Sequence, residues 1–325
     1  MDYAVSIEDI RAAANRLKGI AVRTPLIESP LLNERAGGRV FVKSENLQNG
    51  GAFKFRGAYN RLSQFTEAEK AAGALAFSSG NHAQGIALAA KMLGIKATIV
   101  MPEDAPKLKV DGTRGYGADV VFYDRYNEDR EEVAAKVADE RGAILVPPYD
   151  STYIIAGQGT VGFEMVQDLQ ALGLTADQAL INCGGGGLAA GAFTALYDAF
   201  PGMAGYVVEP EEFDDVKRSL ETGERQKVDF GARSICDALL TPSPGELTFP
   251  ILQGHGVEGL TVTDDEARRA VAYAAKTLKL VGEPGGVVSL AAVLAGKVET
   301  KGKVTVCVIS GGNIDPAMLQ ECLAL

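Results

Sequence analysis

Residues 74–101 read ALAFSSGNHAQGIALAAKMLGIKATIVM, and this stretch predicts the fold class. A short apolar run at Ala74–Phe77 precedes a helical pattern over Asn81–Leu93, and a second apolar run follows at Ala97–Met101. A strand, a helix and a strand in this order are typical of a parallel sheet whose crossover connections are helices. The stretch therefore predicts an α/β protein.

The same alternation continues toward both ends of the chain. We expect a small domain over residues 69–146 and a larger domain made of residues 1–68 and 147–325, each a mostly parallel twisted sheet flanked by helices. Ligand sites in such folds lie at the carboxyl ends of the strands, often in the cleft between domains. The expected strands are 39–43, 74–77, 97–101, 119–123, 143–146, 178–182, 205–209 and 303–309. The expected helices are 7–17, 57–65, 81–93, 106–116, 125–141, 159–172, 188–200, 264–276 and 286–295.

Composition excludes several function classes. The chain of 325 residues has a net charge of −10, which gives no electrostatic reason to expect nucleic acid or an anionic membrane as a partner. No apolar run approaches the roughly 20 residues that span a bilayer, and the N-terminus has no apolar signal core. We expect a cytoplasmic protein with a small-molecule substrate. Its four cysteines match no metal site and are expected to be reduced.

One lysine stands between two aromatic residues in residues 43–58, KSENLQNGGAFKFRGA. Lys54 is flanked by Phe53 and Phe55, and a glycine pair precedes it. Burial lowers the pKa of an ammonium group, and a neutral amine is a nucleophile. The segment is compatible with a Schiff-base lysine, but also with a solvated lysine on an edge strand.

Three polar or glycine-rich turns follow expected strands. Residues 77–82, FSSGNH, open a helix whose free N–H groups and dipole favour an anion, although a simple Ser or Asn N-cap is the alternative. Residues 183–188, CGGGGL, allow the backbone to wrap a phosphate. Residues 309–313, ISGGN, place Ser310 where it can form one hydrogen bond to a ring atom, or form an ordinary turn.

The glycine loop also fits a competing function. Gly185-x-Gly187-x-x-Ala190 loosely matches the dinucleotide fingerprint, and Glu209 ends the next strand, where a ribose-binding acid would stand. From the loop alone, a nicotinamide enzyme remains an alternative.

Taken in order, the motifs resemble the fold-type II (tryptophan synthase β-like) pyridoxal-phosphate enzymes, and most of all the serine/threonine dehydratases and serine racemases. The resemblance covers nearly the whole chain. The motifs that carry it are KSENLQNGGAFKFRGA, SSGNHAQG, YGADVV, AGQGT, GGGGL, EP at 209–210, EPGG at 283–286 and SGGN.

The resemblance implies a role for particular residues. Lys54 would form the Schiff base with pyridoxal 5′-phosphate and move the α-proton. Ser79 would be a second acid/base on the opposite face. The implied cofactor contacts are Phe53, Lys54, Asn81, Gly184, Gly185, Gly186, Gly187, Leu188 and Ser310. The implied substrate contacts are Ser78, Ser79, Asn81, His82 and Arg130.

A divalent-cation site is also implied by the resemblance. The carboxylates of Glu209 and Asp215 and the carbonyl of Phe213 would bind Mg²⁺ or Ca²⁺, which prefer oxygen ligands. The alternative is an acidic surface loop.

The resemblance implies β-elimination from a β-hydroxy amino acid such as L-threonine or L-serine, giving a 2-oxo acid and ammonia. Serine racemisation and 3-hydroxyaspartate dehydration are the nearest alternatives, and a non-catalytic ligand-binding protein is the alternative of another class. A homodimer is expected. Two departures leave the substrate open: Ala52 and Ala238 stand where relatives commonly have Ser and Gly.

Overall fold

The structure is a computed structural model that describes residues 3–78, 80–105, 107–124, 127–229 and 231–325. A six-stranded sheet forms the larger part, in the order β1-β2-β10-β7-β8-β9. Among its pairs only β1–β2 is antiparallel. Its strands are β1 (Leu26–Glu28), β2 (Arg39–Ser44), β7 (Gln178–Asn182), β8 (Ala204–Pro210), β9 (Glu258–Val262) and β10 (Val304–Ile309).

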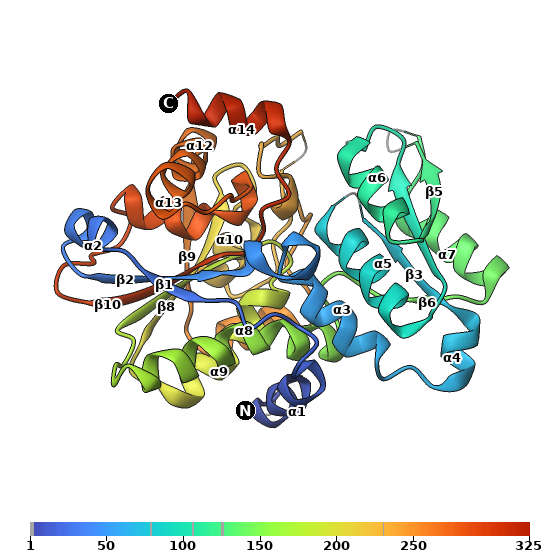
Figure 1. The fold of residues 1–325 in the computed structure, drawn as a ribbon, viewed down its shortest axis with the longest axis horizontal. Helices are drawn as coiled ribbons and strands as arrows, with labels where there is room; N and C mark the ends of the chain where they lie inside the picture. Colours follow the sequence, from blue (N-terminus) through green and yellow to red (C-terminus); the bar gives the residue numbers. More distant parts are fainter. Residues whose placement is uncertain (1–2, 79, 106, 125–126, 230) are drawn as a thin grey trace.

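Helices cover both faces of this sheet (Figure 1), so the central strands are buried on both sides and are apolar along their length. One face carries α1, α8 and α9, and the other α2, α12, α13 and α14. The bounds are α1 (Ile7–Leu17), α2 (Pro30–Ala36), α8 (Thr152–Ala171), α9 (Gly187–Ala199), α12 (Asp264–Tyr273), α13 (Val288–Leu294) and α14 (Pro316–Leu323). Two further helices are α10 (Asp215–Thr222) and α11 (Thr248–Gly254).

The smaller part is a four-stranded parallel sheet in the order β5-β4-β3-β6. Its strands are β3 (Ala74–Phe77), β4 (Ala97–Pro102), β5 (Asp119–Tyr123) and β6 (Ile144–Leu145). Its helices are α4 (Glu67–Ala72), α5 (Asn81–Leu93), α6 (Lys107–Gly115) and α7 (Arg130–Arg141). The whole sheet lies inside the expected range 69–146, while the domain limits themselves stay a prediction.

Two helices begin several residues earlier than expected. Helix α3 (Lys54–Leu62) begins at Lys54, not at Gly57, and α8 begins at Thr152, not at Gly159. Glycine lowers helix propensity, which misplaced the start of α8, where Gly157 and Gly159 lie inside the helix. At Gly157 of α8 the absence of a side chain is required, because a Cβ would lie 2.7 Å from the carbonyl oxygen of Arg56 in α3. Tertiary packing of α3 on α8 therefore overrides propensity.

The predicted fold class is confirmed: two mostly parallel sheets, each flanked by helices. Strands β1 and β9 and helices α2, α4, α10, α11 and α14 were not predicted; β1 and α2 are short, and β9 is a partly exposed edge strand. Within the described residues, no helix combines the length and apolar character needed to cross a bilayer.

Candidate active site

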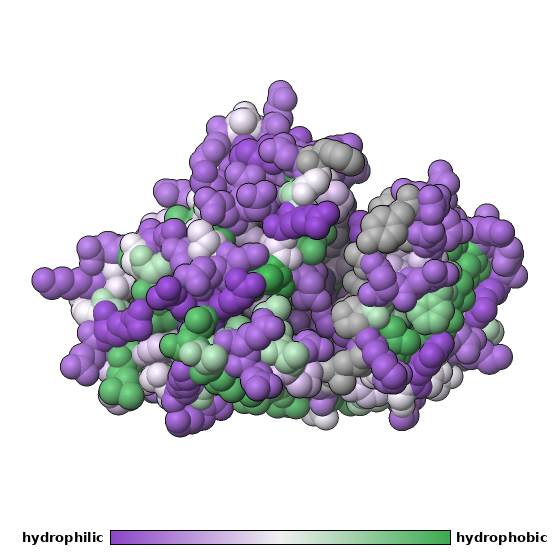
Figure 2. Space-filling model, turned by 90° about the horizontal axis from the view of Figure 1, so that it is seen from above, coloured by the Kyte–Doolittle hydropathy of each residue, from purple (hydrophilic) through white to green (hydrophobic). Residues whose placement is uncertain are grey.

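A cavity of about 820 Å³ opens between the two sheets. Figure 2 shows the cleft that divides this face of the molecule. The cavity is lined by residues that follow strands of both sheets, as expected for parallel α/β folds. Of the residues predicted to bind cofactor or substrate, the cavity wall includes Phe53, Lys54, Ser78, Asn81, His82, Arg130, Gly184, Gly185, Gly186, Gly187, Leu188 and Ser310.

Lys54 is the first residue of α3, and its side chain lies in this cavity. Its Nζ donates a 2.7 Å hydrogen bond to the carbonyl oxygen of Pro148 and lies 5.2 Å from the ring centroid of Phe53. Burial lowers the pKa of Lys54 to about 8. Part of the amine is therefore neutral near physiological pH. The place of Lys54 on a helix and in the cavity wall excludes the solvated edge-strand lysine.

The glycine loop follows β7 and leads into α9, so the N–H groups at the start of the helix have no acceptor within the helix. Gly186 has φ +93°, a conformation that favours glycine. A Cβ on Gly185 would overlap the ring of Tyr149, and one on Gly187 would lie 2.6 Å from Gln158 Oε1. The loop is thus a close-packed backbone cradle for an anion.

Ser310 follows β10, and backbone pairing connects it to the segment that contains Lys54. The N–H of Phe53 donates to the Ser310 carbonyl at 3.0 Å, and Ala52 bridges to Gly311. Ser310 Oγ accepts a 2.9 Å hydrogen bond from Asn182 Nδ2. The orientation of that amide is set by the N–H of Ser289, which donates to Asn182 Oδ1 at 3.0 Å. The Ser310 hydroxyl therefore keeps its proton for donation.

The N-terminus of α5 forms the opposite wall. Ser78 Oγ accepts from the N–H of Gly80 at 3.2 Å. Asn81 donates through Nδ2 to Glu283 Oε1 and accepts at Oδ1 from Asn313 Nδ2 at 2.8 Å. Since an amide nitrogen carries two hydrogens, one N–H of Asn81 remains for another acceptor. Ser79 lies outside the described residues.

His82 is buried and neutral. Its Nε2 lies 2.9 Å from the carbonyl oxygen of Val146, and Nδ1 has no partner among the described residues. Burial first, and then the charge of Lys54, lower the pKa of His82 to about 3. The proton must be on Nε2 to satisfy the carbonyl, so Nδ1 is an acceptor. The hydrogen bond connects α5 to Val146, which follows β6. It leaves His82 no N–H to donate to a substrate carboxylate.

Two cationic side chains come from the smaller sheet's helices. Arg130 begins α7 and lies over Phe77, with 5.3 Å between its guanidinium carbon and the ring centroid. Lys109, on α6, forms an ion pair with Asp237 of the larger part, across the cleft. Lys109 and Asp237 were missed in the sequence, because neither stands in a recognisable motif.

Glu283 was singled out only as part of the EPGG motif. It lies beneath the cavity wall, 1% exposed, with Oε2 unpartnered among the described residues. Burial raises its pKa to about 7, while the charge of Lys109 acts in the opposite direction. Glu283 thus fixes the amide orientation of Asn81, a role that no sequence signal showed.

The expected cation ligands lie apart from this cavity. Glu209, at the end of β8, accepts from the N–H groups of Val216 and Lys217 at 3.1 and 2.8 Å. Asp215 Oδ2 is buried without a partner among the described residues. Burial raises the pKa of Glu209 well above its usual value and that of Asp215 to about 7. Two buried acids side by side contradict a plain surface loop.

Comparison with known proteins agrees with this geometry. The family profile described as "Pyridoxal-phosphate dependent enzyme" matches residues 17–311. An L-threo-3-hydroxyaspartate ammonia-lyase of Pseudomonas sp is 44% identical over 95% of this chain and 96% of its own. A serine racemase of Schizosaccharomyces pombe is 42% identical over 95% and 94%. The crystal structure of a threonine deaminase from T.th. superposes with a TM-score of 0.90, at 42% identity, over 95% of this chain and 99% of that one.

The chain therefore belongs to the family of pyridoxal-phosphate dependent enzymes. The site fits that cofactor: a cradle that a Cβ would fill for its phosphate, an amine of lowered pKa, and a hydroxyl with a free proton all face one cavity. Family membership also decides against the nicotinamide enzyme and the non-catalytic binding protein.

Proposed function

We propose that the protein removes the β-hydroxyl and the amine of a β-hydroxy amino acid, giving a 2-oxo acid and ammonia. The observation that carries the proposal is Lys54: a buried amine with a pKa of about 8, held by a backbone carbonyl in the same cavity as the glycine loop and Ser310. The relatives named above, an ammonia-lyase, a deaminase and a racemase, support it.

Pyridoxal 5′-phosphate would be held by Lys54, by the backbone of Gly184–Leu188, by Asn81 and by Ser310. When bound, this group supplies an aldehyde for the substrate amine and a conjugated ring that accepts electron density from the α-carbon. Ser310 has its proton free to donate to the ring nitrogen, because Asn182 donates to its oxygen, and an uncharged hydroxyl does not hold a proton on that nitrogen as a carboxylate would. A nitrogen that accepts a hydrogen bond is unprotonated, which favours elimination over transamination.

Lys54 would act as the base that takes the α-proton. Once the amine is released from its hydrogen bond to Pro148, burial disfavours its charged form. Ser79 remains our candidate for the second acid/base, which would permit racemisation beside elimination; its position lies outside the described residues.

The substrate carboxylate would be bound at the N-terminus of α5. Ser78 and the free N–H groups of the first turn supply donors there. Arg130 lies on the cavity wall and would contact the substrate from α7. His82 would be part of this wall without donating to the carboxylate, since its only N–H faces Val146.

A divalent cation would bind Glu209, Asp215 and the carbonyl of Phe213. The raised pKa values of the two buried acids and the unpartnered Asp215 oxygen support a cation as the ligand of this site. Mg²⁺ or Ca²⁺ suits such oxygen ligands. The homodimer and the cytoplasmic location stay predictions.

The test is incubation of the purified, cofactor-loaded protein with a panel of hydroxy amino acids: L-serine, L-threonine and 3-hydroxyaspartate. We expect oxo-acid and ammonia in equal amounts, with D-amino acid on a chiral column if racemisation accompanies elimination. Lys54→Ala should lower kcat by roughly a thousandfold or more, while Lys96→Ala, at an exposed lysine, should not change it. Full activity of Lys54→Ala would contradict the proposal.

A further inference from the structure

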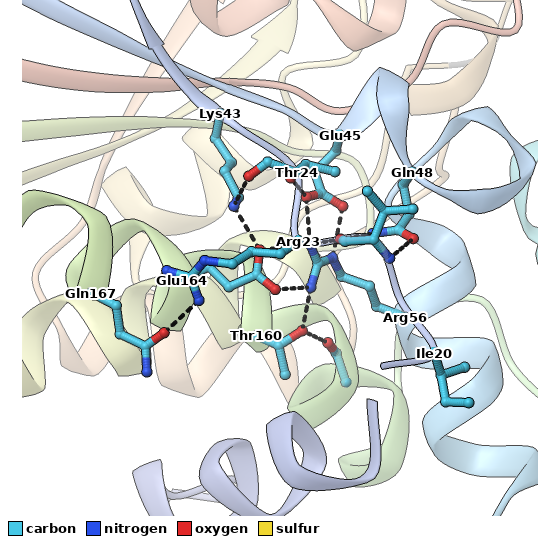
Figure 3. A network of polar contacts seen from close by, with 12 residues as sticks. Ile20, Arg23, Thr24, Lys43, Glu45, Gln48, Arg56, Thr160, Glu164 and Gln167 are labelled. Carbon is cyan, nitrogen blue, oxygen red and sulfur yellow. Dashed lines mark hydrogen bonds and ion pairs between the residues drawn. The ribbon is translucent and has the colours of Figure 1, made fainter. Parts of the chain in front are cut away.

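Four charged side chains form a buried cluster (Figure 3): Lys43, Glu45, Arg56 and Glu164. Three of them belong to residues 43–58, the segment that contains Lys54. Lys43, Glu45 and Arg56 are fully buried, and Glu164 is 14% exposed. None of the four lines the cavity. Buried charges are costly unless they are paired, so their presence requires complete pairing.

Arg56 stands at the centre of the cluster. Its Nε and Nη2 donate to the two Glu45 carboxylate oxygens, both at 2.8 Å. Its Nη1 and Nη2 donate to the two Glu164 oxygens, also at 2.8 Å. Thr160 Oγ1 and the Val22 carbonyl accept at 3.2 Å. Two bidentate pairs on one guanidinium define its position and orientation, because each pair restricts rotation as well as distance.

Lys43 completes the balance of charge. Its Nζ donates to Glu164 Oε2 at 2.6 Å and to the carbonyl oxygen of Thr24 at 2.7 Å. Two cations and two carboxylates are paired directly, and the Thr24 hydroxyl donates to Glu45. A third carboxylate, that of Asp168, lies 3.9 Å from Lys43 Nζ and is paired with Arg23. Lysine in place of Arg56 could keep the charge, but its three donors on one nitrogen could not reproduce the two bidentate pairs.

The cluster joins three segments that each carry part of the active site. Arg56 lies in the first turn of α3, two residues after Lys54. Glu45 directly follows β2, whose last residue, Ser44, pairs with Ile309, the neighbour of Ser310. Glu164 lies on α8, which begins four residues after Pro148, the acceptor of Lys54.

We propose that Arg56 is a positioning residue for the reaction: through Glu45 and Glu164 it holds the first turn of α3, and with it Lys54, in place relative to Ser310 and Pro148. The inference rests on the proposed function, because it concerns the geometry in which Lys54 meets the α-proton. A base displaced by about 1 Å can lose roughly a hundredfold in rate.

Arg56→Lys is the main test, in the cofactor-loaded protein. We expect a folded variant whose kcat falls by about tenfold or more while KM changes by less than about threefold, since only the placement of the base is disturbed. The visible circular dichroism of the bound cofactor should weaken or shift, and cofactor release should become faster. Glu164→Gln, which leaves the Glu45 pair intact, should act in the same direction but less strongly.

Leu32→Ala is the matched control. Leu32 is fully buried on α2, far from the cleft, so its truncation lowers stability without touching the site. If Arg56→Lys and Glu164→Gln lower only the melting temperature, as Leu32→Ala should, and keep wild-type kcat and visible circular dichroism, the positioning role is wrong. If Arg56→Lys does not fold, Glu164→Gln decides.

The two proposals fail in different ways. If wild-type protein forms no oxo acid from any hydroxy amino acid, the proposed function is wrong, whereas the circular dichroism and the cofactor release rate of the variants still test the positioning role.

Discussion

Ser310 shows how much of the chemistry depends on the partner of a single side chain. A serine hydroxyl can donate and accept, and the sequence leaves both roles open. In the structure Asn182 donates to Ser310 Oγ, and the backbone N–H of Ser289 prevents the amide from turning over. The hydroxyl proton is therefore free to be donated toward the cavity.

This argument predicts the effect of two substitutions at Ser310. Ser310→Ala should lower cofactor affinity by a few-fold, because one net hydrogen bond is worth about 1 kcal/mol, and should keep elimination as the main reaction. Ser310→Asp should shift the visible absorption band and lower kcat for elimination by about tenfold or more, since a carboxylate favours a protonated ring nitrogen. Absorption spectra and oxo-acid assays measure both. An unchanged spectrum in Ser310→Asp would contradict the assigned contact.

Asp215 carries a pH prediction. Its pKa in the fold is about 7, raised chiefly by burial, and so lies above its value of about 4 in an unfolded chain. The protonated form therefore stabilises the fold at low pH, and this stability is lost as the pH rises through about 7. In the presence of a chelator, the melting temperature should therefore fall as the pH rises to about 7. Addition of Mg²⁺ or Ca²⁺ should restore the melting temperature near that pH.

Asp215→Asn should remove the response to the cation and reduce the pH dependence, while Glu209, whose pKa is also raised by burial, keeps its own share of it. Glu211→Gln, at an exposed acid in the same loop, is the control and should behave as wild type. A wild-type melting temperature that responds to neither chelator nor cation would contradict the cation site.

At the scale of elements, the turn from β7 into α9 depends on backbone that approaches other atoms closely. Gly185 packs against the Tyr149 ring, and Gly202, shortly after the end of α9, has open space around its α-carbon. Gly185→Ala should weaken cofactor binding by about tenfold or more, because either the ring or the cradle must move. Gly202→Ala should leave it unchanged. Titration of the cofactor-free protein measures both affinities, and equal affinities would exclude the cradle.

The same scale shows where sequence reasoning succeeded and failed. The strands that are buried on both faces, such as β7 in the larger sheet and β4 in the smaller, could be predicted from their apolar runs. The start of α8 could not, because its glycines lower helix propensity and are needed only where α3 crosses it. Edge strands β1 and β9 lack a continuous apolar run, so no periodicity identified them.

At the scale of the whole molecule, the ion pair between Lys109 and Asp237 connects the two parts across the cleft. Lys109 is 7% exposed at its side chain and Asp237 44%, so the pair should contribute no more than about 1 kcal/mol to holding the cleft closed. Lys109→Met should therefore raise KM by a factor of up to about five and slightly increase the radius of gyration measured by small-angle scattering.

Lys107→Met is the matched control, since it removes the same charge from the same helix. Lys107 is exposed and pairs with Asp111 within α6 rather than across the cleft. If both variants change KM and the radius of gyration equally, the effect is one of net charge, and the pair does not hold the cleft.

The sequence by itself determined the fold class and marked Lys54 and the glycine-rich turns as candidate site residues, because strand–helix alternation, a lysine between aromatics and runs of glycine are local patterns. Only the tertiary structure decided how these groups act. Four features depend on residues far apart in the chain: the free proton of Ser310, the neutral state of His82, the hydrogen bond from Asn81 to Glu283 and the charge cluster around Arg56. Partners and burial determine pKa values and donor roles, and neither can be read from local order along the chain.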